Sequence, residues 1–313
     1  MKNKFVTGVL TAAAVAVFAA GCGNAASESG DKTVQQDTQD NGVASTGDQG
    51  KSENGADDPA QETEVQVFIA ASLNTVMTDL AEQYKQIHPE VTIVYNADSS
   101  GTLLTQIQEG YACDLFFSAA QKQMDQLDAD GLLVAGSRSN VVNNQVVVVT
   151  RKGSGTKVTG LADLGKAESL ALADGSVPVG KYTRQALINL DLLEKADDPA
   201  QITTQQVSQA LGGVEISEQA NVSKVLAAVL EGSCEVGTTY YSDTYGYEEE
   251  LEILETVGSD LTGNVIYPLA LVENEEADGA QQNAAKEFAD YLLSEEAKEV
   301  FRSYYFDTDV SIR

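Results

Sequence analysis

Short apolar runs alternate with segments of helical periodicity from residue 65 to the C-terminus, and this alternation constrains the fold more than any other feature. The segment 73–87 carries apolar residues at helical spacing and is followed by a His-Pro pair. In contrast, 146–150 is a continuous apolar run of the kind that is buried inside a sheet. Alternating strands and helices predict an α/β fold with helices on both faces of the sheet.

The pattern predicts strands at 65–69, 91–95, 114–118, 146–150, 169–173, 236–241 and 264–272. It predicts helices at 73–87, 102–108, 121–129, 181–193, 222–231, 284–293 and 295–304. Pro268 predicts that the last strand lies at a sheet edge or crosses between sheets, because proline cannot donate a ladder hydrogen bond. The polar stretch 197–219 is expected to form a short helix and a loop. Two α/β lobes of about 100 residues each fit this length.

The N-terminus has the features of an export signal. Lys2 and Lys4 precede an uncharged apolar run at 5–20, which is shorter than the ~20 residues of a membrane-spanning helix. Small residues lie directly before Cys22, as in the bacterial lipobox, although Ala19 stands where leucine is usual. We therefore predict a lipoprotein signal peptide at 1–21 and lipidation of Cys22. An ordinary signal peptide with an incidental cysteine is the alternative.

Residues 22–63 are predicted to form a disordered acidic tether. They consist mainly of Ser, Gly, Asn, Asp, Gln, Glu and Ala, so they cannot bury enough apolar surface to offset the entropy of ordering. They carry nine acidic residues against two lysines. Such a tether suits a lipid-anchored domain that is held away from a membrane.

The whole chain is strongly acidic, with 48 Asp and Glu residues against 19 Lys and Arg and a formal net charge of -29 over 313 residues. This balance argues against nucleic-acid binding, which needs clustered cations. The single histidine, His88, argues against histidine metal sites and against Ser-His or Cys-His catalysis. Cys113 and Cys234 are expected to be buried thiols, with a disulfide as the alternative.

One local arrangement recurs where predicted strands lead into helices. Small or hydroxyl residues follow the strand end, as at Ser72, at Ser100, in the turn 174–180 and at Asn221. Free backbone N–H groups at helix N-termini attract anions, and in open α/β sheets ligands bind beyond the carboxyl ends of the strands. Several such ends that face one cleft can hold an anion without a cationic side chain. The alternative is that these polar residues serve only as N-caps.

Six short motifs, in this order, resemble the molybdate-binding proteins (ModA type) of ABC transporters. They are VFIAASL at 67–73, SSGTL at 99–103, DLFFSA at 114–119, VPVGKY at 177–182, GTTYYSD at 237–243 and YPLALV at 267–272. The resemblance extends from about residue 64 to the C-terminus. It implies a type 2 periplasmic-binding-protein fold, with the ligand in a cleft between two α/β lobes built on mixed sheets. Lobe 1 would comprise 65–146 and 264–313, and lobe 2 would comprise 147–263.

The resemblance also implies a set of ligand-binding residues. Ser72 and Ser100 would each donate a hydroxyl and a backbone N–H group, Val179 and Val222 would donate backbone N–H groups, and Tyr240 would donate its phenol. The family usually has alanine at the position of Val179, a change that a backbone donor tolerates. Molybdenum or tungsten would be held only as its oxyanion.

The implied function is capture of molybdate or tungstate outside the cytoplasm and delivery to the permease of an ABC importer. The protein would be a monomer, lipid-anchored at the outer face of the cell membrane, without a cofactor and without enzymatic activity. Asp98 would either cap a helix or disfavour a dianion by pointing into the cleft. The alternatives are a binding protein for another oxyanion, such as sulfate, and an extracellular hydrolase.

Overall fold

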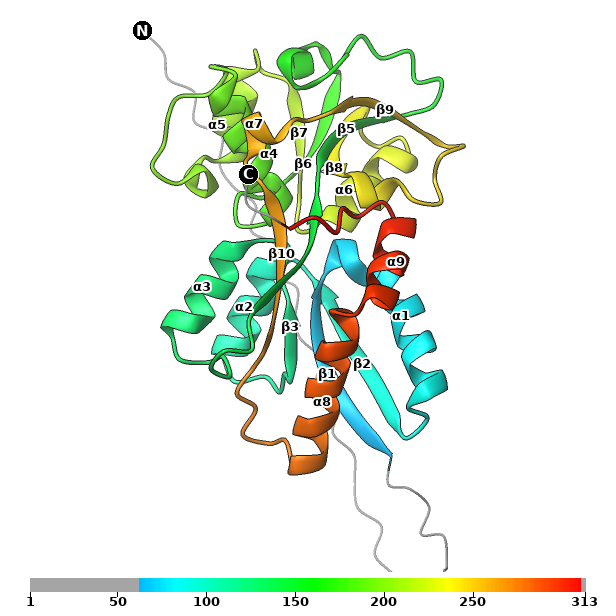
Figure 1. The fold of residues 1–313 in the computed structure, drawn as a ribbon. Coiled ribbons are helices and arrows are strands. Elements are labelled where there is room, and N and C mark those ends of the chain that lie inside the picture. The colour runs from blue at the N-terminus through cyan, green and yellow to red at the C-terminus, as the bar shows by residue number, and fades with distance from the viewer. Residues whose placement is uncertain (1–61, 311–313) are drawn as a thin grey trace, which may run out of the picture. The chain divides into compact units, whose positions relative to one another are not determined.

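A computed structural model describes residues 62–310 of the chain. The predicted signal peptide, Cys22 and nearly all of the predicted tether lie outside these residues. Within the described part, the strands form two five-stranded sheets. None of the helices described is both long enough and apolar enough to cross a membrane. We call the sheet that holds the first strand, with its helices, lobe 1, and the other sheet with its helices lobe 2 (Figure 1).

The sheet of lobe 1 has the strand order β2-β1-β3-β10-β4. Its strands are β1 (Thr63–Ala70), β2 (Val91–Asp98), β3 (Leu115–Phe117), β4 (Ser139–Asn144) and β10 (Val265–Leu271). Its helices are the 3-10 turn η1 (Ala71–Leu73), α1 (Asn74–Ile87), α2 (Ser100–Gln108), α3 (Gln121–Ala129), α8 (Gly279–Leu292) and α9 (Glu295–Ser303). β1 pairs in parallel with β2 and β3, whereas β10 is antiparallel to both of its neighbours, so the sheet is mixed.

The alternation of β1 side chains explains why helices cover both faces of this sheet. Val67 and Ile69 belong to one core cluster, with α1, α8 and α9, whereas Phe68 belongs to a second cluster, with α2 and α3. Successive residues of a strand point to opposite faces, so a strand buried on both faces must be apolar throughout. Figure 1 shows α1, α8 and α9 on one side of the sheet and α2 and α3 on the other.

The sheet of lobe 2 has the strand order β7-β6-β8-β5-β9. Its strands are β5 (Val146–Arg151), β6 (Ser169–Ala173), β7 (Glu215–Gln219), β8 (Val236–Tyr240) and β9 (Leu251–Thr256). Its helices are η2 (Leu161–Lys166), α4 (Pro178–Asn189), η3 (Pro199–Gln201), α5 (Thr204–Ala210), α6 (Val222–Leu230), η4 (Tyr241–Thr244) and α7 (Ser259–Thr262). β6 is parallel to β7 and β8, and β5 is antiparallel to β8 and β9.

Two neighbouring residues of β8 show that helices cover both faces of this sheet as well. A Cβ atom at Gly237 would lie 2.8 Å from a methyl group of Val229, so glycine lets α6 approach the strand closely. The hydroxyl of Thr183 on α4 donates to the hydroxyl of Thr238, at 3.0 Å. Because residues 237 and 238 point to opposite faces, α4 and α6 lie on opposite sides of the sheet.

The chain passes between the lobes at two places. Gln145 joins β4 to β5, and residues 257–264 lead from β9 back to β10. β10 lies between β3 and β4, so the prediction that Pro268 marks an edge strand is wrong, while the chain does cross into lobe 1 at this strand. The pairing of β10 with β4 shifts register between Tyr267 and Pro268, and this irregularity accommodates the missing N–H donor.

The structure adds strands that the sequence pattern does not predict, namely β4, β7 and β9. It also separates the two cysteines that remain within the described part. Cys113 precedes β3 in lobe 1 and Cys234 precedes β8 in lobe 2, and both are free and buried. The disulfide alternative is therefore wrong. Burial raises the pKa of the Cys113 thiol.

Candidate functional site

The topology brings the carboxyl ends of parallel strands from both lobes to one cavity. The turns that follow β1 and β2 supply one wall, and the turn that follows β6, the start of α6 and the end of β8 supply the other. Ligands of open α/β folds bind at such strand ends. The cavity is lined by Ala70, Ala71, Ser72, Asp98, Ser99, Ser100, Ala119, Val177, Pro178, Val179, Val222 and Tyr240.

All five residues that the sequence resemblance implies lie on this lining. Ser72 and Ser100 come from lobe 1, and Val179, Val222 and Tyr240 come from lobe 2. The five are at most 9% exposed. The cavity has a volume of about 10 Å³, close to the minimum that holds one water molecule. The two lobes therefore meet closely around this point.

The Ser100 hydroxyl is oriented by the backbone of the neighbouring strand end. Its oxygen accepts a hydrogen bond from the N–H group of Ala119, at 2.9 Å. The N-cap of α2 is Ser99, whose hydroxyl oxygen accepts from the N–H group of Thr102 at 3.1 Å. Ser100 is thus not the capping residue. Its own proton has no acceptor among the described residues.

The Ser72 hydroxyl lies next to a buried phenol. Its oxygen is 2.9 Å from the Tyr267 hydroxyl oxygen, and Tyr267 comes from β10, almost two hundred positions later in the chain. The N-cap position of η1 is Ala70, which has no capping side chain, so Ser72 is not a helix cap either. Asn221, in contrast, is the N-cap of α6, and its side-chain oxygen accepts from the N–H group of Lys224 at 3.0 Å.

The Tyr240 hydroxyl has no hydrogen-bond partner within the described part of the chain, although the side chain is only 1% exposed. Burial raises the pKa of Tyr240 well above its ordinary value, so the phenol keeps its proton. A buried hydroxyl without a partner costs free energy, and native structures usually satisfy such groups. This orphaned donor on the cavity wall therefore points to a ligand.

Backbone N–H groups complete the set of donors. Val179 is the second residue of α4 and Val222 is the first residue of α6. The first N–H groups of a helix have no intrahelical acceptor, and the helix dipole makes them favourable to anions. Pro178 suits the first position of α4, because its missing N–H group would be unpaired there anyway.

Arg184 is a buried cation that the sequence reading did not single out. Its guanidinium is fully buried and donates to the carbonyl oxygens of Ala173 at 2.8 Å, Gly180 at 2.9 Å and Ile202 at 2.7 Å. These bonds fix the two ends of the turn that carries Val179. The signal available in the sequence was an arginine on the otherwise apolar face of a predicted helix.

Asp98 connects the two lobes at the edge of the cavity. Its Oδ1 atom accepts from the Ser99 N–H group at 2.7 Å and from the Asn221 side-chain amide at 3.0 Å. Asp98 ends β2 of lobe 1, whereas Asn221 is the N-cap of α6 in lobe 2. The carboxylate therefore does not cap the helix, and its Oδ1 atom is held by donors of its own.

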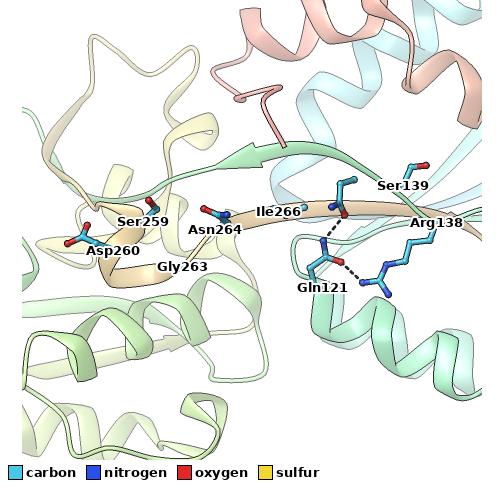
Figure 2. Close-up of a pocket in the computed structure, with 9 residues that line it drawn as sticks. Gln121, Arg138, Ser139, Ser259, Asp260, Gly263, Asn264 and Ile266 are labelled. Carbon is cyan, nitrogen blue, oxygen red and sulfur yellow. Dashed lines mark hydrogen bonds between the residues drawn. The ribbon is translucent and has the colours of Figure 1, made fainter. Parts of the chain in front are cut away.

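A larger hollow of about 850 Å³ lies beside the strands that join the lobes, and Figure 2 shows its lining. Three of its polar side chains, those of Gln121, Arg138 and Asn140, bond to one another. Arg138 pairs with Asp125 at 2.7 Å and also donates to Gln121, whose amide donates to Asn140 at 2.6 Å. The smaller cavity, by comparison, gathers donors whose protons are uncommitted. No cluster of potential metal ligands occurs among residues 62–310.

Comparisons with known proteins identify the family of this chain. A family model described as bacterial extracellular solute-binding protein matches residues 65–307. YvgL of Bacillus subtilis (strain 168), assigned as an ABC transporter substrate-binding lipoprotein, is 30% identical over 253 residues, which are 80% of this chain and 89% of that protein. The molybdate-binding protein ModA of Escherichia coli (strain K12) is 32% identical over 257 residues, 79% of this chain and 90% of that protein.

A solved structure shows the same relation in three dimensions. It is the substrate binding domain assigned to a molybdenum ABC transporter of Clostridium difficile, with a TM-score of 0.56 and 30% identity over 78% of this chain and 98% of that one. The sequence motifs, the two-lobed fold and the comparisons all indicate the same family. The chain belongs to the bacterial extracellular solute-binding proteins and, among them, to the ModA-type family of molybdate-binding proteins.

Proposed function

We propose that this protein captures molybdate or tungstate in the cavity between its lobes and delivers it to the permease of an ABC importer. The observation that carries the proposal is the set of three buried hydroxyls at Ser72, Ser100 and Tyr240, which line one cavity. Among residues 62–310, the Tyr240 hydroxyl has no hydrogen-bond partner. The N–H groups of Val179 and Val222 would supply further donors.

The chemistry of these donors favours a fully deprotonated oxyanion. Molybdate and tungstate carry no proton near neutral pH, so they only accept hydrogen bonds, and a wall of donors matches them. A phosphate that still bears a proton needs an acceptor for it, and the carboxylate on the lining, that of Asp98, already accepts two hydrogen bonds at its Oδ1 atom. Sulfate has the same charge and protonation state as molybdate, so the size of the cavity would have to separate them.

The position of the protein in the cell follows from the same proposal. Cys22 would carry the lipid, and residues 22–63 would tether the two lobes to the outer face of the cell membrane as a monomer. The support is the lipobox-like sequence before Cys22 and the similarity to a relative assigned as a lipoprotein. Binding would need no cofactor and no catalytic step.

Titration of the purified full chain tests the function. Calorimetry and thermal unfolding are measured with molybdate, tungstate, sulfate and phosphate. A ligand present at 1,000 times its Kd should add about 4 kcal/mol to the free energy of unfolding, because it binds only the folded state. We expect this effect with molybdate or tungstate. Absence of binding by both would refute the proposal.

Single-atom changes test the site. Tyr240→Phe and Ser100→Ala should each weaken molybdate binding about 10-fold or more, because a hydrogen bond to a charged group contributes about 1.5–3 kcal/mol. Tyr84→Phe is a matched control, since the Tyr84 hydroxyl is also buried and has no hydrogen-bond partner in the described part of the chain, but it lies on α1 and does not line the cavity. Unchanged affinity in both site variants would show that the ligand binds elsewhere.

A further inference from the structure

Behind Ser72 lies a chain of buried polar groups that does not touch the cavity itself. The Tyr267 side chain is fully buried, and its hydroxyl lies between two partners. On one side the Nδ2 atom of Asn144 donates to it at 3.2 Å, and on the other side the Ser72 hydroxyl oxygen is 2.9 Å away. Neither Asn144 nor Tyr267 lines the cavity.

The backbone fixes the orientation of the Asn144 amide. Its Oδ1 atom accepts from the N–H group of Gln145 at 2.9 Å and from that of Ser242 at 3.5 Å. An N–H donor can face only the oxygen of an amide side chain, so the nitrogen must lie on the other side. Its two hydrogens then go to the Ser242 hydroxyl at 2.8 Å and to the Tyr267 hydroxyl.

The direction of the next hydrogen bond follows. Burial raises the pKa of Tyr267 well above its ordinary value, so the phenol carries one proton. Its oxygen already accepts from Asn144, and the acceptor that the described residues offer within hydrogen-bonding distance is the Ser72 oxygen. If Ser72 donated instead, the phenol proton would be buried without an acceptor. Tyr267 therefore donates to Ser72, and the proton of Ser72 is left for the cavity.

We propose that Asn144 and Tyr267 are positioning residues, which preset the Ser72 hydroxyl as a donor to the bound oxyanion and so favour ligands without a proton. This inference rests on the function proposed above. We call the hydrogen-bonded series Asn144, Tyr267 and Ser72 the relay. It leaves the Ser72 hydroxyl in the same condition as the Ser100 hydroxyl, whose oxygen accepts from the Ala119 N–H group. Both hydroxyls have their acceptor capacity partly used, and both can direct their proton to a ligand.

The two serines differ in the groups that orient their hydroxyl protons, and this difference makes the relay testable. Ser100 depends on a backbone group of its own lobe, whereas Ser72 depends on two side chains distant in sequence. Asn144 lies at the end of β4, where the chain leaves lobe 1, and its other amide hydrogen is held by Ser242 just beyond β8. The donor character of Ser72 thus depends on the junction between the lobes.

A double-mutant cycle measures whether Tyr267 acts through Ser72. Molybdate binding by the full chain is titrated for the unaltered protein, Tyr267→Phe, Ser72→Ala and the double variant. Tyr267→Phe should weaken binding about 3- to 10-fold, the range of one neutral hydrogen bond. In the Ser72→Ala background the same change should have almost no effect, because the hydroxyl on which it acts is gone.

The matched cycle uses Ser100→Ala in place of Ser72→Ala. There the two effects should multiply, since Ser100 receives its hydrogen bond from Ala119 and not from the relay. A second readout is the ratio of molybdate to phosphate affinity. Tyr267→Phe should lower this ratio, because the Ser72 oxygen then becomes available to accept a ligand proton. A Tyr267 that only filled space would weaken all oxyanions equally.

The outcomes separate the relay from the function on which it rests. Failure of the unaltered protein to bind molybdate or tungstate overturns both proposals. Binding with independent effects of Tyr267→Phe and Ser72→Ala overturns the relay alone. If Tyr267→Phe does not yield folded protein, Asn144→Ala takes its place in the same two cycles, since it removes the amide that fixes the phenol, and independence from Ser72→Ala is again the contradicting result.

Discussion

Asp243 is a half-buried carboxylate that contacts the backbone of Tyr240. Its Oδ2 atom accepts from the Thr239 hydroxyl at 2.7 Å and from the Tyr240 N–H group at 2.9 Å, so it holds the end of β8 in place. Burial raises the pKa of Asp243 from 3.8 to about 6, and these two hydrogen bonds offset only part of that effect. Asp243 therefore binds its proton more tightly in the folded protein than in the unfolded chain.

Replacing this carboxyl group should change how stability depends on pH. Because its pKa is higher in the folded state, Asp243 contributes to the free energy of unfolding. This contribution is complete below about pH 4 and is lost as the pH rises through about 6. Asp243→Asn keeps an oxygen acceptor but does not titrate. The unfolding free energy of the original protein should therefore fall relative to the variant by at most about 3 kcal/mol between pH 4 and 7. Chemical denaturation at both pH values measures this, and parallel pH profiles would contradict it.

Among single residues, the sequence predicts the groups that line the cavity but not those that support them. Ser72, Ser100 and Tyr240 are predicted because each lies within a short motif that resembles the ModA type, at the end of a strand or between a strand and a helix. Tyr267 and Arg184 act through contacts made in three dimensions. Nothing in the neighbouring sequence of Tyr267 shows that its hydroxyl meets a serine on a different strand end, so spacing alone does not find the relay.

The turn between β6 and α4 depends on a glycine. A Cβ atom at Gly180 would lie 2.1 Å from the carbonyl oxygen of Asp174 and 2.5 Å from that of Ala173, both backbone atoms that cannot rotate away. The Ala173 oxygen is also one of the acceptors of the buried Arg184 guanidinium. The first turn of α4, with Val179, is thus held between a close backbone contact and a cation.

Gly180→Ala should displace this first turn. We expect a loss of unfolding free energy of about 1–3 kcal/mol from overpacking, together with weaker oxyanion binding, because the Val179 N–H group moves. Gly279→Ala is a control on α8, where an added Cβ meets nothing within 4 Å. Calorimetry and thermal unfolding of both variants give the two quantities. Wild-type affinity in Gly180→Ala would show that Val179 does not contribute a donor.

Among helices and strands, the sequence pattern predicts the helices more accurately. The helices of lobe 1 have apolar faces at regular spacing, and α3 has the predicted bounds, Gln121–Ala129. β7 and β9 lie at the two edges of the lobe 2 sheet, where most side chains are not buried and the apolar signal is weak. β4 is half asparagine, and tertiary pairing with β10 makes it a strand.

The whole molecule is far more acidic than its site. The net charge of -29 creates a repulsive field for an approaching dianion, while the proposed first contacts are neutral hydroxyl and N–H groups. Long-range repulsion slows the approach of the ligand and is screened by salt. Short hydrogen bonds in a buried cavity are screened much less. The acidity of the chain is therefore compatible with an anion as ligand.

Stopped-flow kinetics can separate these two effects. The association rate constant of molybdate should rise, on the order of 10-fold, when the salt concentration is raised from about 10 mM to 300 mM, because screening removes the repulsion. The dissociation rate constant should change much less. A dianion that was steered by local positive potential would bind more slowly as salt is added, and that result would contradict the prediction.

One contact between the lobes has a consequence for affinity. Lys122 on α3 and Asp198 beside η3 form an ion pair at 2.6 Å that does not line the cavity. Such a pair would favour the arrangement in which the two lobes meet, and every ligand that needs this arrangement would gain or lose affinity by the same factor. Natural variation at this pair would tune the uptake threshold of the cell for its oxyanion without altering which oxyanion is chosen.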